Sequence, residues 1–348
     1  MTMTIQDKLN ELDTLAKSCK RLLIMPHDNP DPDAMSSAAA LHYLMSKRHN
    51  IQCTIAYGGI IGRAENRTMM KLLNIPTRPL QEIKFIKFTH FALLDTQPMT
   101  GNNSLPSSIK PSIVIDHHPL RKQTCSDFLD IRVDYGATAT ILTEYMKASG
   151  LEIPCNLATA LFYGISSETQ DLGREARPVD TQAYHALFPL INKRALSQIA
   201  FPILPHDYFV TLQRCLQNTY TYRHIIISKL GNITNPDHVS LIADLLLRHE
   251  RMGWSFVIGR YTNKLLLSAR TSNPRANAGS ILTNVVKPFG TAGGHKMIAG
   301  GKIDCNGKQP EEIMALENEI VERFLKRTMR QQIPAGKPLL ETLIETLV

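Results

Sequence analysis

The residues best suited to chemistry lie in a short segment that follows an apolar stretch near the N-terminus. Within seven residues this segment places His27 and the carboxylates of Asp28, Asp31 and Asp33, with prolines between them. Like charges held this close together are unfavourable unless a cation neutralises them. The segment therefore predicts a metal site. Taken alone, it also fits a proline-rich surface loop in which Asp33 caps the following helix.

Two further apolar stretches end in polar side chains of the same kind. Residues 91–94 are apolar and are followed by Asp95, and residues 113–115 are followed by Asp116, His117 and His118. A single carboxylate after a buried strand is ordinary, whereas an acid followed by two histidines is a better candidate for a site. Both stretches read as strands, so their polar ends are expected to face the same edge of a sheet.

Together the three segments predict one ligand set rather than three separate loops. The side chains expected to meet are His27, Asp31, Asp33, Asp95 and His117. A mixture of carboxylate and imidazole ligands suits manganese, magnesium or zinc better than a metal that prefers thiolates. Five ligands are more than one ion usually takes from protein while keeping open positions. Two divalent ions that share one carboxylate, as in many enzymes of phosphoryl hydrolysis, are the simplest interpretation.

The elements that must position these side chains alternate between strands and helices in the first half of the chain. Strands are expected at residues 21–25, 51–57, 91–94 and 112–115, and helices at 5–19, 34–47, 64–73, 137–148 and 158–165, the last running into a loop. Short buried strands separated by helices are typical of a parallel sheet in an α/β domain. We assign this first domain to residues 1–190.

The second half has a different pattern. Residues 191–216 read as a connection with helical pieces, since Pro202 and Pro205 interrupt the regular pattern. Strands are expected at 222–229, 254–261, 264–270 and 298–304, and helices at 238–249 and 277–286. The strands at 254–261 and 264–270 form a hairpin. The predicted fold is thus α/β, with a smaller mixed-sheet domain at residues 217–330 and a tail at 331–348.

The length and composition of the chain limit the class of protein it can be. The 348 residues suffice for two domains, and 43% hydrophobic residues are ordinary for a globular protein. Lysine and arginine exceed aspartate and glutamate by eight, which favours polyanionic partners such as nucleotides or RNA. Six cysteines at scattered positions indicate thiols in a reducing compartment, and neither a signal peptide nor a membrane span is expected. We therefore expect a cytoplasmic protein without a membrane partner.

These residues resemble the DHH phosphoesterase family. The Asp116-His117-His118 triplet, the segment 27–34 and the strand-end Asp95 are similar to the motifs of its first domain. Residues 268–271, 290–295 and 299–301 are similar to the glycine-rich signature of the DHH-associated C-terminal domain. The resemblance covers about residues 15–305, with the two halves in the expected order.

The resemblance implies two divalent ions, usually manganese and alternatively magnesium, in a cleft between the domains. It assigns His27 and Asp31 to the first ion, Asp33 and His117 to the second, and Asp95 to both. His118 would lie beside the phosphate, and Asp116 would support the histidines. In the C-terminal domain the implied substrate contacts are Arg270, Gly293, Gly294 and His295.

The chain departs from the family pattern at the last metal ligand. Family members usually carry an aspartate in a Gly-Ile-x-x-Asp-Thr segment, whereas this sequence has Glu168 in that position. Glutamate also offers oxygen ligands but is one methylene longer, so the second site is expected to differ in geometry or metal preference. Asp171 is the alternative ligand.

The function implied is hydrolysis of short oligoribonucleotides or small nucleotides, such as 3′-phosphoadenosine-5′-phosphate, through in-line attack of water on phosphorus. The alternatives are a cyclic- or linear-dinucleotide phosphodiesterase, a single-strand exonuclease, a pyrophosphatase and a non-catalytic nucleotide sensor. The Gly293-Gly294-His295 signature argues against a pyrophosphatase, while Glu168 motivates the sensor. A homodimer is the expected assembly.

Overall fold

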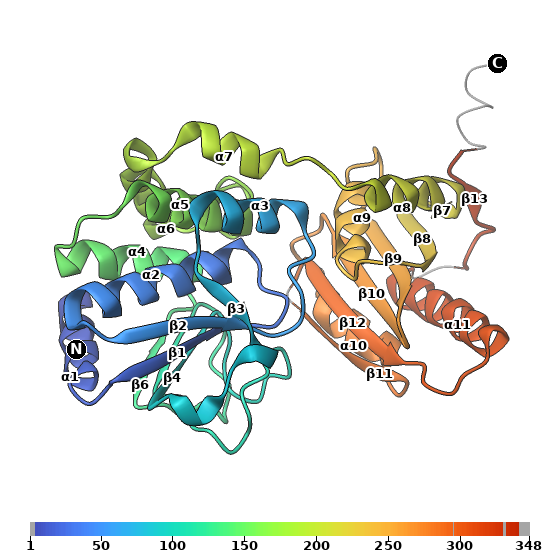
Figure 1. Cartoon of the computed structure of the whole chain (residues 1–348). Coiled ribbons are helices and arrows are strands. Elements are labelled where there is room, and N and C mark those ends of the chain that lie inside the picture. Colours follow the sequence, from blue (N-terminus) through green and yellow to red (C-terminus); the bar gives the residue numbers. More distant parts are fainter. Residues whose placement is uncertain (1–3, 295, 330–331, 341–348) are drawn as a thin grey trace. The chain divides into compact units, whose positions relative to one another are not determined.

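The chain forms two compact units, which meet at residues 203 and 204. The computed structural model describes residues 4–294, 296–329 and 332–340 (Figure 1). The junction lies inside the predicted connection of residues 191–216. That connection contains two helices, α7 (Lys193–Ala200) in the first unit and α8 (His206–Gln217) in the second.

The first unit is built on a six-stranded sheet in the order β3-β2-β1-β4-β5-β6. Its strands are β1 (Arg21–Pro26), β2 (Gln52–Tyr57), β3 (Thr77–Pro79), β4 (His90–Leu94), β5 (Ile113–Asp116) and β6 (Phe128–Ile131). Every neighbouring pair is parallel, which confirms the predicted parallel sheet. The short strands β3 and β6 were not predicted.

Helices cover one face of this sheet, as Figure 1 shows for the blue and green part of the chain. They are α1 (Ile5–Ala16), α2 (Pro32–His49), α3 (Ala64–Leu73), α4 (Thr138–Ser149), α5 (Cys155–Thr169) and α6 (Pro178–Leu187), together with α7. Leu22 and Ile24 of β1 pack into the core beneath the helices, whereas Leu23 and Met25 belong to a smaller cluster on the opposite face. A parallel strand buried on both faces explains the continuous apolar run from which β1 was predicted.

The strand order brings the polar strand ends together. In the parallel register, Pro26 of β1 lies beside Leu94 of β4, and Leu94 lies beside Ile115 of β5. The residues that follow these three positions are His27, Asp95 and Asp116. The strand order reverses at β1, with β2 and β3 on one side of it and β4, β5 and β6 on the other. Open α/β sheets bind ligands at such a switch point.

The second unit has a seven-stranded mixed sheet in the order β11-β12-β10-β9-β8-β7-β13. Its strands are β7 (Thr219–Tyr222), β8 (Ile225–Asn232), β9 (Trp254–Tyr261), β10 (Lys264–Thr271), β11 (Gly290–Gly294), β12 (Ile298–Asp304) and β13 (Lys337–Pro338). Only β8 and β9 pair in parallel among these described strands. The predicted mixed sheet and the hairpin of β9 and β10 are confirmed.

Helices pack on both faces of the second sheet. The helices α10 (Ala278–Val286) and α11 (Pro310–Thr328) contribute to one core cluster, and α8 and α9 (His238–Leu247) contribute to another. Helix α11 was not predicted. The strand predicted at 222–229 corresponds to β8, which begins three residues later, because Arg223 adopts a positive φ of 57° and turns the chain between β7 and β8; the short strand β7 was not predicted.

Candidate metal centre

His27 follows β1 and faces two carboxylates with one ring nitrogen. Its Nδ1 donates a hydrogen bond to the carbonyl oxygen of Asp28 at 2.9 Å. Its Nε2 lies 3.5 Å from Asp31 Oδ2 and 3.7 Å from Asp95 Oδ2. Burial alone would lower the pKa of His27, but the carboxylates of Asp31 and Asp95 outweigh burial and raise it to about 10. The backbone bond thus orients Nε2 toward a site with an excess of negative charge.

The two carboxylate oxygens of Asp31 have different roles, one in capping a helix and one in the candidate site. It is the N-cap of α2, where its Oδ1 accepts a hydrogen bond from the backbone N–H of Ala34 at 2.9 Å, and Pro32 opens the helix. Its Oδ2 is the oxygen that faces His27. Burial would raise the pKa of Asp31, but the neighbouring His27 lowers it overall. The helix cap that the sequence suggested for Asp33 is therefore made by Asp31.

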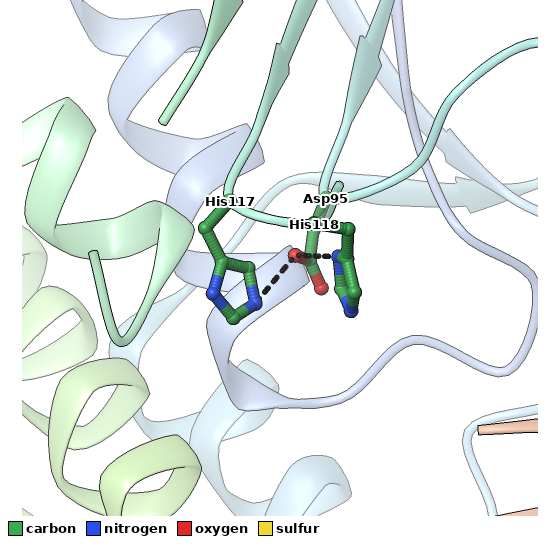
Figure 2. Close-up of side chains that lie close together, drawn as sticks. All are labelled: Asp95, His117 and His118. Carbon is green, nitrogen blue, oxygen red and sulfur yellow. Dashed lines mark ion pairs between the residues drawn. The ribbon is translucent and has the colours of Figure 1, made fainter. Parts of the chain in front are cut away.

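Asp95 stands at the centre of the cluster. It follows β4 with a left-handed φ of 56°, a conformation that few residues other than glycine adopt, and its side chain is only 5% exposed. Its Oδ1 lies 3.5 Å from both His117 Nε2 and His118 Nδ1, as the dashed lines in Figure 2 show. Its Oδ2 faces His27. Burial is the largest cause of the raised pKa of Asp95.

The two histidines after β5 are held by different partners. His117 Nδ1 donates to the carbonyl oxygen of Tyr135 at 3.2 Å, so that Nε2 faces Asp95. His118 Nδ1 instead donates to Asp116 Oδ1 at 2.7 Å. Burial would lower the pKa of His117, but Asp95 and other acids raise it. Burial would raise the pKa of the Asp116 carboxyl, but its hydrogen bond with His118 lowers that pKa overall.

Asp33 lies at the N-terminus of a different helix from its own. Its Oδ2 accepts a hydrogen bond from the backbone N–H of Thr138 at 2.8 Å, and its Oδ1 accepts one from Ala139 at 2.7 Å. Both donors belong to the first turn of α4, where the backbone N–H groups have no partner within the helix and favour an anion. Burial and then the charge of Asp95 raise the pKa of Asp33, which places its carboxyl in the field of the cluster.

The last predicted ligand lies on a helix rather than in a loop. Helix α5 continues to Thr169 and therefore includes Glu168, which corrects the predicted helix end at residue 165. Burial raises the pKa of Glu168 to about 7, with further contributions from Asp31 and Asp33. Its Oε1 lies 3.7 Å from Arg174 Nη2. Asp171 instead accepts a hydrogen bond from the Ser166 hydroxyl. Glu168 is thus the acid that acts on the cluster electrostatically.

The donor set fits divalent cations. Two groups have potential ligand atoms within 4.8 Å of one another, one formed by His27, Asp31 and Asp95 and the other by Asp95, His117 and His118. Asp95 belongs to both groups. Carboxylate and imidazole donors suit manganese, magnesium or zinc. The first group coincides with the ligands predicted for the first ion. The second contains His117 as predicted and adds His118, while Asp33 and Glu168 lie outside both groups.

Two residues that sequence reasoning missed hold the cluster in place. Thr138 donates its hydroxyl to Asp95 Oδ1 at 2.8 Å and its backbone N–H to Asp33, so it connects two predicted ligands. Gln97 is buried and donates to Asp116 Oδ2 at 2.8 Å. Its Oε1 accepts bonds from the backbone of Arg121 and the hydroxyl of Thr124. Neither residue type signals a metal site, although Gln97 lies only two residues after the predicted ligand Asp95.

The predicted substrate residues of the second unit have well-defined local surroundings. Arg270 is buried, and its Nε donates to Asp244 Oδ1 at 2.5 Å while Nη1 donates to Ser268 Oγ at 2.7 Å. Gly293 and Gly294 belong to β11 rather than to a loop. Gly294 has a φ of 147°, and a Cβ there would lie 2.2 Å from the carbonyl oxygen of Ile298. His295 lies outside the described residues, and substrate binding by these residues stays a prediction.

Comparisons with known proteins support the same division of the chain. The N-terminal domain of the DHH family matches residues 21–165, and the DHHA1 domain matches residues 223–326. An uncharacterized protein of Methanocaldococcus jannaschii is 37% identical over 81% of this chain and 58% of its own length. A probable manganese-dependent inorganic pyrophosphatase of Lactobacillus delbrueckii subsp. bulgaricus is 28% identical over 42% of this chain and 47% of its own length. The chain thus spans about half the length of these curated relatives.

Solved structures share the fold at low sequence identity. An exopolyphosphatase-related protein from Bacteroides fragilis aligns with a TM-score of 0.74 and 13% identity, over 94% of this chain and all of that one. RecJ from Thermus thermophilus, solved in complex with Mn²⁺, aligns with a TM-score of 0.54 and 13% identity, over 96% of this chain and 56% of that one. With both of its characteristic domains matched in order, the chain belongs to the DHH family.

Proposed function

We propose that this protein is a metal-dependent phosphoesterase that works with two divalent ions, manganese in the first instance and magnesium as the alternative. The observation that carries the proposal is the position of Asp95, whose carboxylate belongs to both groups of potential ligands. A carboxylate shared by two ions is characteristic of phosphoryl hydrolysis. The manganese named for the Lactobacillus relative and for the RecJ complex supports this choice of metal.

In this proposal each ligand keeps the role that the family resemblance implies. His27, Asp31 and Asp95 would hold one ion, and Asp95 and His117 the other, with Asp33 and Glu168 completing the second site. When bound, such ions act as Lewis acids toward phosphoryl oxygens and lower the pKa of water. Because the ring nitrogens of His27 and His117 that face Asp95 must be unprotonated to bind an ion, ion binding would displace protons there.

His118 is the residue best placed to act on the substrate. Its side chain is 31% exposed, whereas that of His117 is 12% exposed. The hydrogen bond from Nδ1 to Asp116 fixes the ring and leaves Nε2 as the second nitrogen for a contact to a phosphate oxygen or leaving group. Gln97 holds the opposite oxygen of Asp116, so the acid keeps its position when the histidine donates.

The substrates we propose are short oligoribonucleotides and small nucleotides such as 3′-phosphoadenosine-5′-phosphate. The net positive charge of the chain and the presence of a DHHA1 domain support a nucleotide rather than a neutral ester. Cyclic- or linear-dinucleotide hydrolysis is the alternative within the same chemistry. A pyrophosphatase is the second candidate, because curated relatives of that name match this chain, the Lactobacillus protein over 42% of it.

A substrate panel tests the proposal directly. Di- to pentaribonucleotides, 3′-phosphoadenosine-5′-phosphate, cyclic dinucleotides, long single-stranded DNA and pyrophosphate would be incubated with the full chain in Mn²⁺ or Mg²⁺. We expect turnover of short RNA or the small nucleotide, and no turnover in a chelator. Faster release of phosphate from pyrophosphate would favour the second candidate. Tight nucleotide binding without turnover in saturating Mn²⁺ would replace the hydrolase with a sensor.

A further inference from the structure

The second unit contains a cavity of about 720 Å³ that includes none of the residues predicted for the reaction. It is formed by β7, β8, the end of α8 and the side of α11. Its size lies within the range of roughly 300–1,000 Å³ that is usual for small-molecule sites. The lining combines aromatic, cationic and amide side chains, so its chemistry can be examined group by group.

One wall of the cavity is a sheet face with two tyrosine rings, of which one is exposed. Tyr220 and Tyr222 are two residues apart on β7 and therefore project from the same face. Tyr220 pairs directly with Ile227 of β8, so Lys229, two residues further along β8, projects from this face as well. Tyr220 is 43% exposed. The ring of Tyr222 is packed by the chain at Gly336, where an added Cβ would lie 2.7 Å from it. Tyr220 is thus the ring that a ligand could cover.

Two cations border this wall, and their hydrogen-bond partners are neutral. Lys229 donates to the side-chain oxygen of Asn318 on α11. Arg214 on α8 donates to the carbonyl oxygen of Asn232 at 2.7 Å. The acid in the lining, Glu317, has both oxygens engaged by Arg260, at 2.6 and 2.8 Å. The lining therefore carries two cations and a single acid that is already paired with Arg260, which gives the cavity a positive character.

The burial of Lys229 supports the same conclusion. Burial lowers the pKa of the Lys229 ammonium by more than the nearby Glu317 carboxylate raises it, the direction expected when a buried cation lacks a sufficient counter-anion. A bound phosphate would supply that anion. Next to Lys229 the strand is irregular, because the register with β9 shifts between Lys229 and Asn232 and Gly231 has a positive φ of 63°. This bulge brings main-chain groups as well as Asn232 into the lining.

We propose that this cavity is an accessory binding site for a nucleoside phosphate. The base would stack on Tyr220, and the phosphate would lie between Lys229 and Arg214. The amides of Asn218 and Asn318 would supply polar contacts to the base edge or the ribose. Stacking on an aromatic ring together with a nearby cation is a recurrent way to bind single nucleotide units. The site is independent of the proposed hydrolysis, since it requires no metal ion.

Binding of adenosine 5′-monophosphate to the full chain in a chelator-containing buffer tests this site by calorimetry. We expect the nucleotide to bind more tightly than adenosine alone or inorganic phosphate alone, because only the nucleotide provides both a base and a phosphate. Tyr220→Ala should weaken binding about tenfold, in line with the usual contribution of base stacking, whereas Tyr220→Phe should preserve it. Lys229→Ala should weaken binding about fivefold and reduce its salt dependence.

Two controls separate this site from the proposed reaction site. Lys264→Ala removes an exposed lysine of β10 that does not line the cavity, and it should leave binding unchanged. Asp95→Asn should also leave metal-free binding unchanged. If Tyr220→Ala and Lys229→Ala bind like the unmodified chain while folding normally by circular dichroism, the proposal is wrong. Absence of binding at millimolar nucleotide would equally overturn it, whatever the outcome of the hydrolysis assays.

Discussion

The second unit and the strand-end cluster of the first unit differ in how their buried charges are paired. In the second unit, Arg260 makes a two-pronged ion pair with Glu317, so that each charge has its counterpart within the fold. In the first unit, the acids of the strand ends face histidines and one another, and burial raises the pKa of both Asp33 and Asp95. Buried charges without a permanent partner are costly to a folded protein. The difference supports the proposal that cations complete the first unit.

The same comparison distinguishes structural from functional acids. Asp130 also lies buried in the first unit, but Arg132 binds both of its oxygens, at 2.9 and 2.7 Å. Within the described part of the chain, the ion pairs of Asp95 are all to histidines. Strongly perturbed groups are enriched at functional sites, although ion-pair networks perturb them too. Here the partner type, rather than burial alone, separates the two cases.

The largest effect is expected from Asp95→Asn, which keeps the shape of the side chain and removes its charge. Loss of an outer partner of a metal ligand typically costs about 10- to 100-fold, so loss of the ligand shared by both groups should cost more than about a hundredfold in turnover. Steady-state assays together with a count of bound Mn²⁺ would measure it. Glu144→Gln, which alters an ion pair with Arg132, is the matched control and should retain activity. Full activity of Asp95→Asn would exclude the shared role.

A smaller effect is expected from Thr138→Val, which removes the hydroxyl that donates to Asp95 but keeps the backbone bond to Asp33. We expect Mn²⁺ affinity to fall about tenfold. The matched variant is Thr211→Val in the second unit, where the hydroxyl of a buried threonine bonds the carbonyl oxygen of Asp207. That variant should lower the free energy of unfolding without changing Mn²⁺ affinity. Equal affinities for both variants would show that Thr138 serves only the fold.

Glu168→Asp should change activity by less than about threefold or raise it. The carboxylate is kept, and the main consequence is a shift of its position by one methylene. Assays in Mn²⁺ and Mg²⁺ would show whether the metal preference changes with the length of the side chain. A sharp loss of activity would instead show that the glutamate is a specific adaptation of this chain. Asp171→Asn serves as the control, since that acid bonds Ser166.

The smallest effect concerns His42, a histidine of α2 outside the cluster. Burial lowers its pKa in the folded state. The unfolded chain therefore binds a proton at His42 more readily than the folded chain does. The free energy of unfolding is unaffected well above the unfolded pKa of about 6.5 and decreases as the pH falls below that value. His42→Asn should flatten the decline of the urea midpoint between about pH 6.5 and 5. An unchanged decline in the variant would assign the pH response to other groups.

The strand ends could be predicted from the sequence because the pattern and the geometry reinforce each other. Apolar runs such as 22–25 and 113–115 form buried parallel strands, and parallel strands end at a common edge. The supports of the site could not be predicted in the same way. Thr138 and Gln97 act through hydrogen bonds between segments far apart in the chain, and threonine and glutamine are ordinary in either place.

The errors in the second unit have local causes. Arg223 and His224 form the turn between β7 and β8, although neither is a typical turn residue, so the turn was included in the predicted strand and β7 was missed. Helix α11 was overlooked despite the spacing of Leu316, Ile320 and Phe324, which are buried at intervals of four residues. In α11 many charged residues stand between these apolar positions and obscured the helical period.

The bonds that anchor Asp33 have a consequence for how the protein can vary. Both donors are main-chain N–H groups, at positions 138 and 139. Exchanging the side chain at position 139 leaves its donor intact, unless the newcomer is proline, which has no N–H. Selection can therefore alter that side chain for packing while the anchor persists. Surveys of tolerated substitutions would register strong constraint at the acid and little at position 139, although that position helps to secure it.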